Sequence, residues 1–181
     1  SRVLVRPYTD GETQLVVNNS GSAFKGSQRV VIKGWFEQVL DDPNMQTTEW
    51  GTEIYPDGLR RGLIEVTRRY HLPIYITENG IGVAEDVSQG EVQDDYRIAF
   101  MKDHIAAIKA AQEAGADVRG YFVWSTFDLY SWKNGCRKRY GLVAVDFENG
   151  YTRTPKKSYR WYRDFIAGEQ IGKPYQEEGQ R

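Results

Sequence analysis

The sequence predicts an α/β fold in which helices cover a parallel sheet. Three features of residues 50–167 support this prediction. Apolar residues recur at helical spacing in three segments, short runs of β-branched and aromatic residues lie between these segments, and the order is helix, strand, helix, strand, helix. Strands that alternate with helices form parallel sheets, because each helix returns the chain to the end of the sheet at which the preceding strand began.

The helices are marked by apolar residues at steps of three and four. The first begins near Pro56, with Asp57 placed to cap it, and the second covers about residues 94–114. The last has Pro155 at its first position, and Thr154 is expected to be its N-cap. The side chains expected to face inward are Leu59, Leu63, Val66 and Tyr70 in the first helix, Ile98, Met101, Ile105 and Ile108 in the second, and Tyr159, Tyr162, Phe165 and Ile166 in the last.

The strands are short and the loops that follow them are long. Residues 74–77, 119–124 and 141–146 are expected to be strands, the first of them buried, and shorter strands are indicated at 14–17 and 29–32. Long, functionally rich loops after the strands are typical of a (β/α)₈ barrel. That barrel takes about 250 residues. The 181-residue chain is therefore expected to be either a portion of such a barrel or a smaller, open α/β domain.

Composition excludes several classes of function. Hydrophobic residues make up 40% of the chain and charged residues 27%, as in ordinary globular proteins. No apolar run approaches the roughly 18 residues that span a membrane. The single cysteine, Cys136, allows no internal disulfide and fits a reducing compartment. The two histidines, His71 and His104, lie too far apart for a zinc motif, so no metal is expected.

Charge is distributed unevenly along the chain. Residues 130–163 carry nine Lys and Arg side chains and two carboxylates, whereas the whole chain has a formal net charge of -1. A basic segment in an otherwise acidic chain indicates a small anionic ligand rather than nucleic acid, because a polyanion would also meet the acidic remainder. The competing interpretation is that residues 156–163 form a solvated helix face.

Three positions carry side chains suited to chemistry. Glu78 lies at the end of a predicted buried strand. Its carboxylate has either a functional role or a structural one, hydrogen-bonded at the rim of the strand. Residues 124–128 combine aromatic and polar side chains, with Trp124 either in a ligand site or in the core. Residues 131–140 supply a hydroxyl, cations and a phenol, which suit a phosphate group. A nucleic-acid interface is disfavoured there, because residues 1–129 contain no second basic patch.

Three motifs then resemble glycoside hydrolase family 1 in their order and spacing: Ile76-Thr77-Glu78-Asn79-Gly80, Trp124-Ser125-x-x-Asp128 and Arg139-Tyr140-Gly141-Leu142-x-x-Val145-Asp146. The resemblance covers about residues 50–166 and implies a retaining β-glycosidase on a (β/α)₈ barrel, with Glu78 as the nucleophile. Retaining enzymes also need a second carboxyl group as acid/base. The family carries it in an Asn-Glu-Pro motif, which this sequence lacks.

The chain is therefore expected to be the C-terminal part of the barrel, incomplete as given and inactive alone. Its partner would be the missing N-terminal part of the barrel. Residues 1–181 would form one portion of a single glycosidase domain, with a poorly readable lead-in at 1–49, the family-like core at 50–167 and a tail at 168–181.

The loop after the second strand resembles that of the family's 6-phospho-β-glucosidases. Ser131 replaces the Glu with which ordinary β-glucosidases hold sugar hydroxyls, and Lys138 and Tyr140 follow at the spacing of the phosphate-binding residues. A Glu there would repel a phosphate, whereas Ser removes that charge and supplies a donor. The same resemblance implies that Trp132 contacts the sugar and that Trp124 forms the floor of the glycone site by stacking.

The expected function is hydrolysis of 6-phospho-β-D-glucosides with retention of configuration, in the cytoplasm. The substrate would be a phosphorylated β-glucoside, and no metal, organic cofactor, nucleic acid or membrane partner is expected. A 6-phospho-β-galactosidase and a plain β-glucosidase are alternatives in the same class. A non-catalytic phosphosugar-binding fragment is the alternative of another class.

Overall fold

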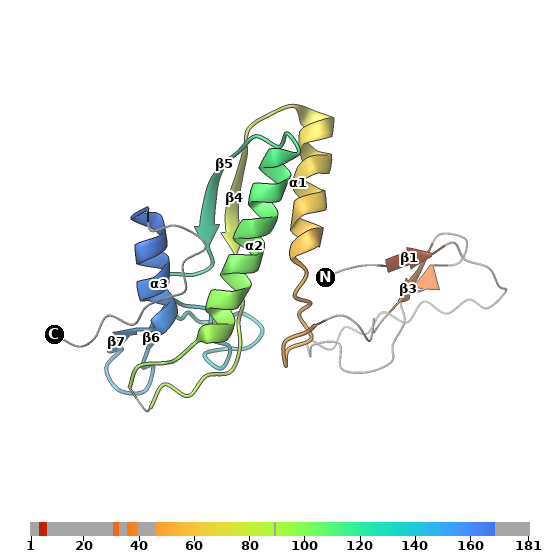
Figure 1. The fold of residues 1–181 in the computed structure, drawn as a ribbon. Coiled ribbons are helices and arrows are strands. Elements are labelled where there is room, and N and C mark those ends of the chain that lie inside the picture. Colours follow the sequence, from red (N-terminus) through yellow and green to blue (C-terminus); the bar gives the residue numbers. More distant parts are fainter. Residues whose placement is uncertain (1–3, 7–30, 33–35, 40–45, 89, 169–181) are drawn as a thin grey trace. The chain divides into compact units, whose positions relative to one another are not determined.

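The computed structural model (Figure 1) describes residues 4–6, 31–32, 36–39, 46–88 and 90–168. The chain divides into two compact units, residues 1–55 and 56–181.

The first unit contains a small antiparallel sheet in the order β1-β3-β2. Its strands are β1 (Leu4–Arg6), β2 (Val31–Ile32) and β3 (Phe36–Val39). β2 lies within the segment predicted as a strand at 29–32. The strand predicted at 14–17 lies outside the described residues.

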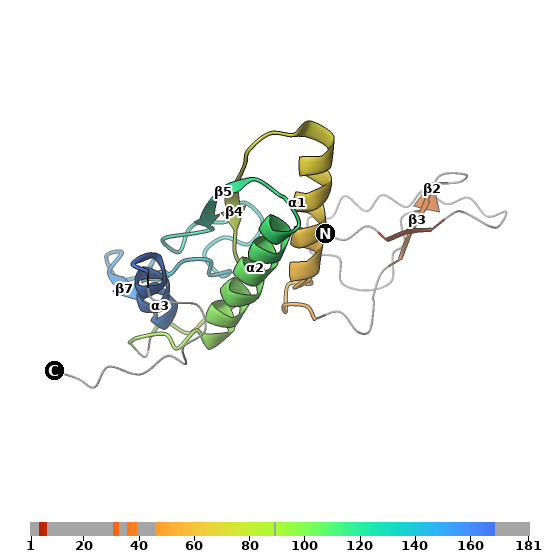
Figure 2. The same ribbon diagram turned by 45° about the horizontal axis from the view of Figure 1, so that its top comes forward.

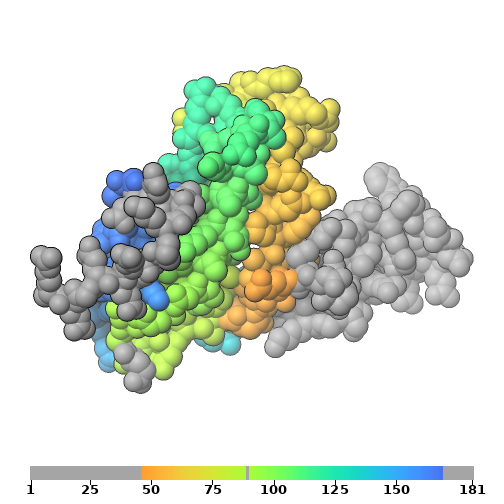
Figure 3. Space-filling view, in the orientation of Figure 1, coloured from red at the N-terminus to blue at the C-terminus, as the bar shows by residue number. Residues whose placement is uncertain are grey.

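The second unit is built around two parallel strands joined by a helix. β4 (Ile74–Asn79) leads to α2 (Asp95–Glu113), which returns the chain to β5 (Val118–Val123) beside β4. α1 (Pro56–Tyr70) precedes them and packs against α2. Figures 1 and 2 show α1 and α2 on one side of the strand pair, and Figure 3 shows their adjoining surfaces in gold and green. The parallel pairing across a helix confirms the predicted α/β class.

The remaining elements complete this unit. β6 (Val143–Val145) pairs antiparallel with β7 (Arg153–Pro155), and α3 (Lys157–Ile166) follows and packs against α2. The prediction that Thr154 caps the last helix is wrong, because Thr154 pairs with Ala144 in the β6–β7 ladder and the helix begins three residues later. A Thr-Pro pair is a common helix start, but here its Thr154 pairs with β6, ten residues earlier in the chain.

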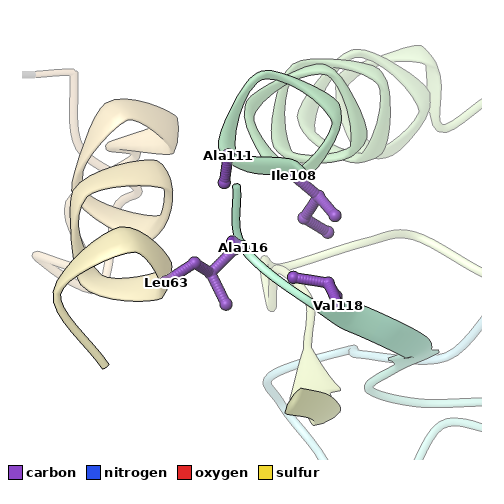
Figure 4. Packing of buried hydrophobic residues seen from close by; sticks show 5 residues of the cluster. All are labelled: Leu63, Ile108, Ala111, Ala116 and Val118. Carbon is purple, nitrogen blue, oxygen red and sulfur yellow. The ribbon is translucent and has the colours of Figure 1, made fainter. Parts of the chain in front are cut away.

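The core of this unit lies between the two helices and the strand pair. Leu63 of α1 points toward Ala116, and Ile108 of α2 lies over Val118 of β5 (Figure 4). Ile74 and Ile76 of β4 and Tyr121 of β5 pack against the same cluster. The alternate side chains of the strands are exposed, among them Tyr75 and Phe122, each at 57%. The strand predicted as buried is therefore covered on one face only.

The helices are less completely buried than their periodicity predicts. Val66 and Tyr70 in α1 are 42% and 63% exposed, and Tyr159 and Ile166 in α3 are 37% and 65% exposed. The apolar stripe of each helix is wider than the described surface that receives it. Asp57 is not a cap either, since it lies inside the first turn of α1. Its carboxylate accepts hydrogen bonds from Arg60 and Arg61, and the bond from Arg60 is the main reason that its pKa is lowered.

Candidate active site

The C-terminal ends of β4 and β5 bring Glu78 and Trp124 to the same edge of the strand pair. The N–H of Trp124 donates to the carbonyl oxygen of Asn79 at 2.9 Å, and the Tyr121 hydroxyl donates to the side-chain oxygen of Asn79 at 2.9 Å. A Cβ on Gly80 would lie 1.8 Å from the Trp124 carbonyl oxygen, so only glycine allows this approach. Burial raises the pKa of the Tyr121 phenol and keeps it a donor. Two of the predicted site residues are thus held at neighbouring strand ends.

Glu78 is exposed near the end of β4. Strict alternation would place Thr77 and Glu78 on opposite faces, yet both are exposed. The register between β4 and β5 shifts between Ile76 and Asn79, and such irregularities redirect side chains at the ends of strands. The Glu78 side chain is therefore accessible to a ligand at this end of the strand pair.

Lys138 and Tyr140 lie beside the loop that continues from Glu78. Val83 and Arg139 exchange two backbone hydrogen bonds of 3.1 and 2.8 Å. A Cβ on Gly82 would lie 2.7 Å from Cε of Lys138 and 2.5 Å from Cε1 of Tyr140, so both side chains pack directly on the main chain of Gly82. The Lys138 side chain is buried, and its Nζ lies 5.4 Å from the centroid of the Tyr140 ring.

Ser131 and Trp132 lie in a tight turn further along the same loop. Ser131 and Gly135 exchange backbone hydrogen bonds of 2.9 and 2.8 Å, and Gly135 adopts a φ of 59° that favours glycine. Trp132 is 99% exposed, so its side chain is not packed into the part of the chain that the structure describes. The described contacts join Lys138 and Tyr140 to the loop after Glu78, whereas those of Ser131 stay within its own turn.

The loops that carry Lys138 and Tyr140 also contact a group of buried charged side chains. The sequence analysis did not identify this group. We call it the buried ion network; its members are Glu85, Asp94, Arg97, Asp128, Arg139 and Lys156. Three cations face three carboxylates, and five of the six side chains are at most 3% exposed, Arg139 being 13% exposed. Because buried charges are costly unless they are paired, an equal number of each sign is the stable composition.

Lys156 and Arg97 connect the network. Lys156 Nζ lies 2.5 Å from Glu85 and 3.0 Å from Asp128, while Arg97 Nη2 lies 2.6 Å from Glu85. Burial alone would lower the pKa of the Arg97 guanidinium, but its neighbours, including Glu85 and Asp94, raise that pKa above the ordinary value. Arg97 is therefore a permanent cation. One signal in the sequence could have found it, since Arg97 lies four residues before Met101 on the buried face of α2, which is mostly apolar.

The network also corrects the interpretation of the basic segment. Lys156 and Arg139 are neutralised by Glu85 and Asp128, which precede that segment in the sequence. Lys157 and Arg160 in α3 pair in the same way with Asp95 and Glu91. Neither a uniform basic field nor a wholly solvated helix face describes these residues.

Comparison with known proteins identifies the family. Residues 8–171 match the model of glycosyl hydrolase family 1. The chain belongs to this family. A 6-phospho-beta-galactosidase of Streptococcus equi subsp. zooepidemicus is 43% identical over 164 residues, which are 90% of this chain and 34% of that protein. The aryl-phospho-beta-D-glucosidase BglC of Bacillus subtilis is 43% identical over 162 residues, 87% of this chain and 33% of that protein. The chain thus spans about a third of the length of these relatives.

Solved structures of family 1 proteins share the fold. A family 1 β-glucosidase from Thermotoga maritima matches with a TM-score of 0.69 at 35% identity, covering 75% of this chain and 30% of that structure. The psychrophilic β-glucosidase BglU of Micrococcus antarcticus matches with a TM-score of 0.66 at 36% identity, covering 72% and 28%. The chain therefore has the fold of part of a family 1 (β/α)₈ barrel, which confirms the predicted family and fold class.

Two further observations concern membranes and metals. Within residues 46–88 and 90–168, neither long helix combines the length and apolar character that crossing a bilayer requires. The described part of the chain also contains no cluster of three or more His, Cys, Asp or Glu side chains suited to binding a metal ion.

Proposed function

We propose that this chain is the C-terminal portion of a retaining 6-phospho-β-glucosidase. The observation that carries the proposal is the packing of Lys138 and Tyr140 on Gly82, four residues after Glu78. It sets a buried cation and a phenol beside the loop that leaves the candidate nucleophile. A phosphate on the sugar that Glu78 attacks would find there the charge-assisted donor that phosphate recognition needs.

Glu78 would act as the nucleophile, attacking the anomeric carbon and releasing the aglycone as the glycosyl–enzyme bond forms. Water would then cleave that bond, which restores the carboxylate and retains the configuration. Retention requires a second carboxyl group about 5–5.5 Å away, to protonate the leaving group and later to activate water. We assign that group to an N-terminal part of the barrel that works with this chain.

The open face of the strand pair supports a role for such a partner. Tyr75 and Phe122 are exposed on the side away from α1 and α2, and each strand has one described neighbour in the sheet. Below, the complete barrel means this chain together with an N-terminal family 1 portion, either fused or co-expressed. On its own, the 181-residue chain is expected to give no turnover, because one carboxylate cannot perform both roles.

Ser131, Lys138 and Tyr140 would hold the 6-phosphate, with Trp132 against the sugar and Trp124 beneath the glycone. A charge-assisted bond from Lys138 would contribute about 1.5–3 kcal/mol to substrate binding. The 99% exposed Trp132 has its whole surface available for a sugar. A phosphorylated glycoside is an anion that does not cross membranes freely, so we propose a cytoplasmic site of action.

A second candidate is 6-phospho-β-galactosidase activity. It is favoured by the Streptococcus relative of that name, which is as identical to this chain, at 43%, as the Bacillus aryl-phospho-β-D-glucosidase. The two activities differ at O4 of the sugar, whereas Lys138 and Tyr140 are proposed to act at O6.

The test compares 4-nitrophenyl β-D-glucoside 6-phosphate, its galactoside counterpart and the unphosphorylated glucoside on the complete barrel. We expect kcat/KM to be highest for the glucoside 6-phosphate. A higher kcat/KM for the galactoside 6-phosphate would favour the 6-phospho-β-galactosidase instead. Equal values of kcat/KM with and without phosphate would indicate a plain β-glucosidase. A 2-deoxy-2-fluoro-glucoside 6-phosphate should label Glu78, and a label on any other residue would overturn the nucleophile assignment.

A further inference from the structure

Arg97 joins two loop segments that are distant in the sequence. Its side chain extends from α2, and one nitrogen, Nη1, lies 2.5 Å from the carbonyl oxygen of Ile81 and 3.1 Å from that of Tyr140. The other nitrogens of this planar guanidinium group, its fork, pair with carboxylates. Nη2 lies 2.6 Å from Glu85, and Nε lies 2.9 Å from Asp94. The side chain is 1% exposed, so no bulk water can replace these bonds.

The two segments that Arg97 joins carry the proposed site residues. Ile81 lies three residues after Glu78, and Tyr140 is itself a proposed phosphate ligand beside Lys138. Both carbonyl groups lie on the same side of the double hydrogen bond of Val83 with Arg139, because that bridge is antiparallel and the residues before Val83 face those after Arg139. Arg97 therefore binds one end of a short antiparallel bridge. One of its two segments follows the proposed nucleophile Glu78, and the other carries the proposed phosphate-binding side chains.

The fork of Arg97 is needed for this contact, rather than its charge alone. A lysine at the same place would keep a positive charge opposite Glu85 and Asp94. A single ammonium group, however, cannot reach two carbonyl oxygens and two carboxylates in the planar arrangement that a guanidinium offers. Loss of the fork would leave the network near neutrality but release one or both carbonyl groups.

We propose that Arg97 is a positioning residue that fixes Lys138 and Tyr140 relative to Glu78 and thereby sets the preference for phosphorylated substrates. The inference rests on the proposed function. Arg97 would touch neither the sugar nor the phosphate. It would act through the main chain of Ile81 and Tyr140, so its replacement would impair phosphate recognition more than bond cleavage.

The experiment measures kcat/KM of the complete barrel for 4-nitrophenyl β-D-glucoside with and without the 6-phosphate. Arg97→Lys should lower the preference for the phosphorylated substrate about 10-fold or more, while kcat/KM for the unphosphorylated one changes less than about 3-fold. Arg68→Lys is the matched control, because Arg68 makes an exposed two-bond contact with Glu65 in α1. It should change the preference less than about 2-fold.

A double-mutant cycle separates positioning from general loss of structure. If Arg97 acts through Lys138 and Tyr140, adding Arg97→Lys to Lys138→Ala should cause a smaller loss for the phosphorylated substrate than Arg97→Lys causes alone. Additive losses, or an unchanged preference in Arg97→Lys, would overturn the inference. A wild-type barrel without any preference for phosphate would overturn the proposed function instead.

Hydrogen exchange of the wild-type barrel gives an answer even where a variant does not fold. The amide of Val83 and that of Ser125, which donates to the Tyr140 carbonyl oxygen at 3.2 Å, should exchange with the same opening free energy, because Arg97 binds the main chain of both segments. Independent exchange of the two amides would contradict the inference.

Discussion

The ammonium group of Lys156 lies 3.0 Å from the carboxylate of Asp128, and both side chains are fully buried. Asp128 follows β5 and also accepts a hydrogen bond from the N–H of Gly141 at 2.9 Å. The N–H of Lys156 donates to the carbonyl oxygen of Leu142 at 2.9 Å, which brings the start of α3 to the same place. One ion pair thus joins the end of a strand, the loop before β6 and the start of a helix.

Replacing Lys156 should be costly for stability. Lys156→Met leaves Glu85 and Asp128 short of a buried cation, and breaking a buried pair in this way costs about 3–5 kcal/mol of the free energy of unfolding. The neighbouring Lys157 pairs with the exposed Asp95, so Lys157→Met should cost less than about 1 kcal/mol. Urea unfolding of the complete barrel measures both, and equal losses would show that burial of the pair is not what matters.

Glu78→Gln should abolish turnover while sparing binding. The amide keeps the size of the side chain but cannot form the glycosyl–enzyme bond, so kcat should fall by several orders of magnitude with the dissociation constant for the phosphorylated substrate changed little. Glu113→Gln, an exposed carboxylate at the end of α2, is the control and should retain wild-type kcat. Retained turnover in Glu78→Gln would exclude Glu78 as the nucleophile.

Lys138→Ala should act on phosphorylated substrates selectively. We expect kcat/KM to fall about 10- to 100-fold for the glucoside 6-phosphate, the scale of one charge-assisted bond, and to stay nearly unchanged for the unphosphorylated glucoside. Lys133→Ala is matched to it, since Lys133 lies in the same loop but is exposed. Both substrates are compared at one ionic strength, because salt screens charged ligands. Equal losses on both substrates would make Lys138 a structural residue.

Ser131→Glu should shift the preference toward unphosphorylated glucosides. The new carboxylate would repel the phosphate and offer an acceptor to a free sugar hydroxyl. Ser131→Ala removes the hydroxyl without adding charge, so it should weaken phosphate binding less and give no gain on the unphosphorylated sugar. Ratios of kcat/KM on the two sugars measure the shift. If Ser131→Glu and Ser131→Ala give the same ratio of kcat/KM on the two sugars, Ser131 does not contact the phosphate.

His104 should make stability depend on pH below about 6.5. The ring is buried in α2 and stacks on Phe100, and burial lowers its pKa in the folded protein below the ordinary value of 6.5. The unfolded chain then binds the proton more tightly, so stability is complete above about pH 6.5 and is lost as the pH falls. Unfolding free energies between pH 7 and 5 should show this loss, and His104→Gln should abolish it. His71→Gln, at the exposed second histidine, should leave it in place.

Local sequence predicted much of the α/β unit, because the signals that define α1, α2, β4 and β5 are local. Apolar spacing located both helices, and a run of β-branched residues located β4. Thr154 shows the limit, since its cap-like context was overruled by pairing with Ala144. No rule based on neighbouring residues reveals that pairing.

The motifs predicted the residues of the candidate site, but they did not predict the buried ion network. Lys138 and Tyr140 lie against Gly82, in the loop after Glu78, and their role at a phosphate stays a prediction. Arg97 was not singled out in the sequence and Lys156 was counted in the basic segment, because their partners Glu85 and Asp128 lie 12 and 28 positions away along the chain. Neutralisation across such separations depends on tertiary structure, so charge counts over a segment overstated its basic character.

The contact at Gly80 implies that two parts of the site can evolve separately, the pair Glu78 and Trp124 and the proposed phosphate site. The relation of Glu78 to Trp124 depends on main-chain atoms, namely the Trp124 N–H on Asn79 and the carbonyl oxygen that occupies the space above Gly80. The proposed phosphate site depends on side chains. We expect that substitutions there can accumulate and redirect the preference for phosphorylated sugars without moving Glu78, the proposed nucleophile. One inherited framework can thus give rise to descendants with different substrates and the same chemistry.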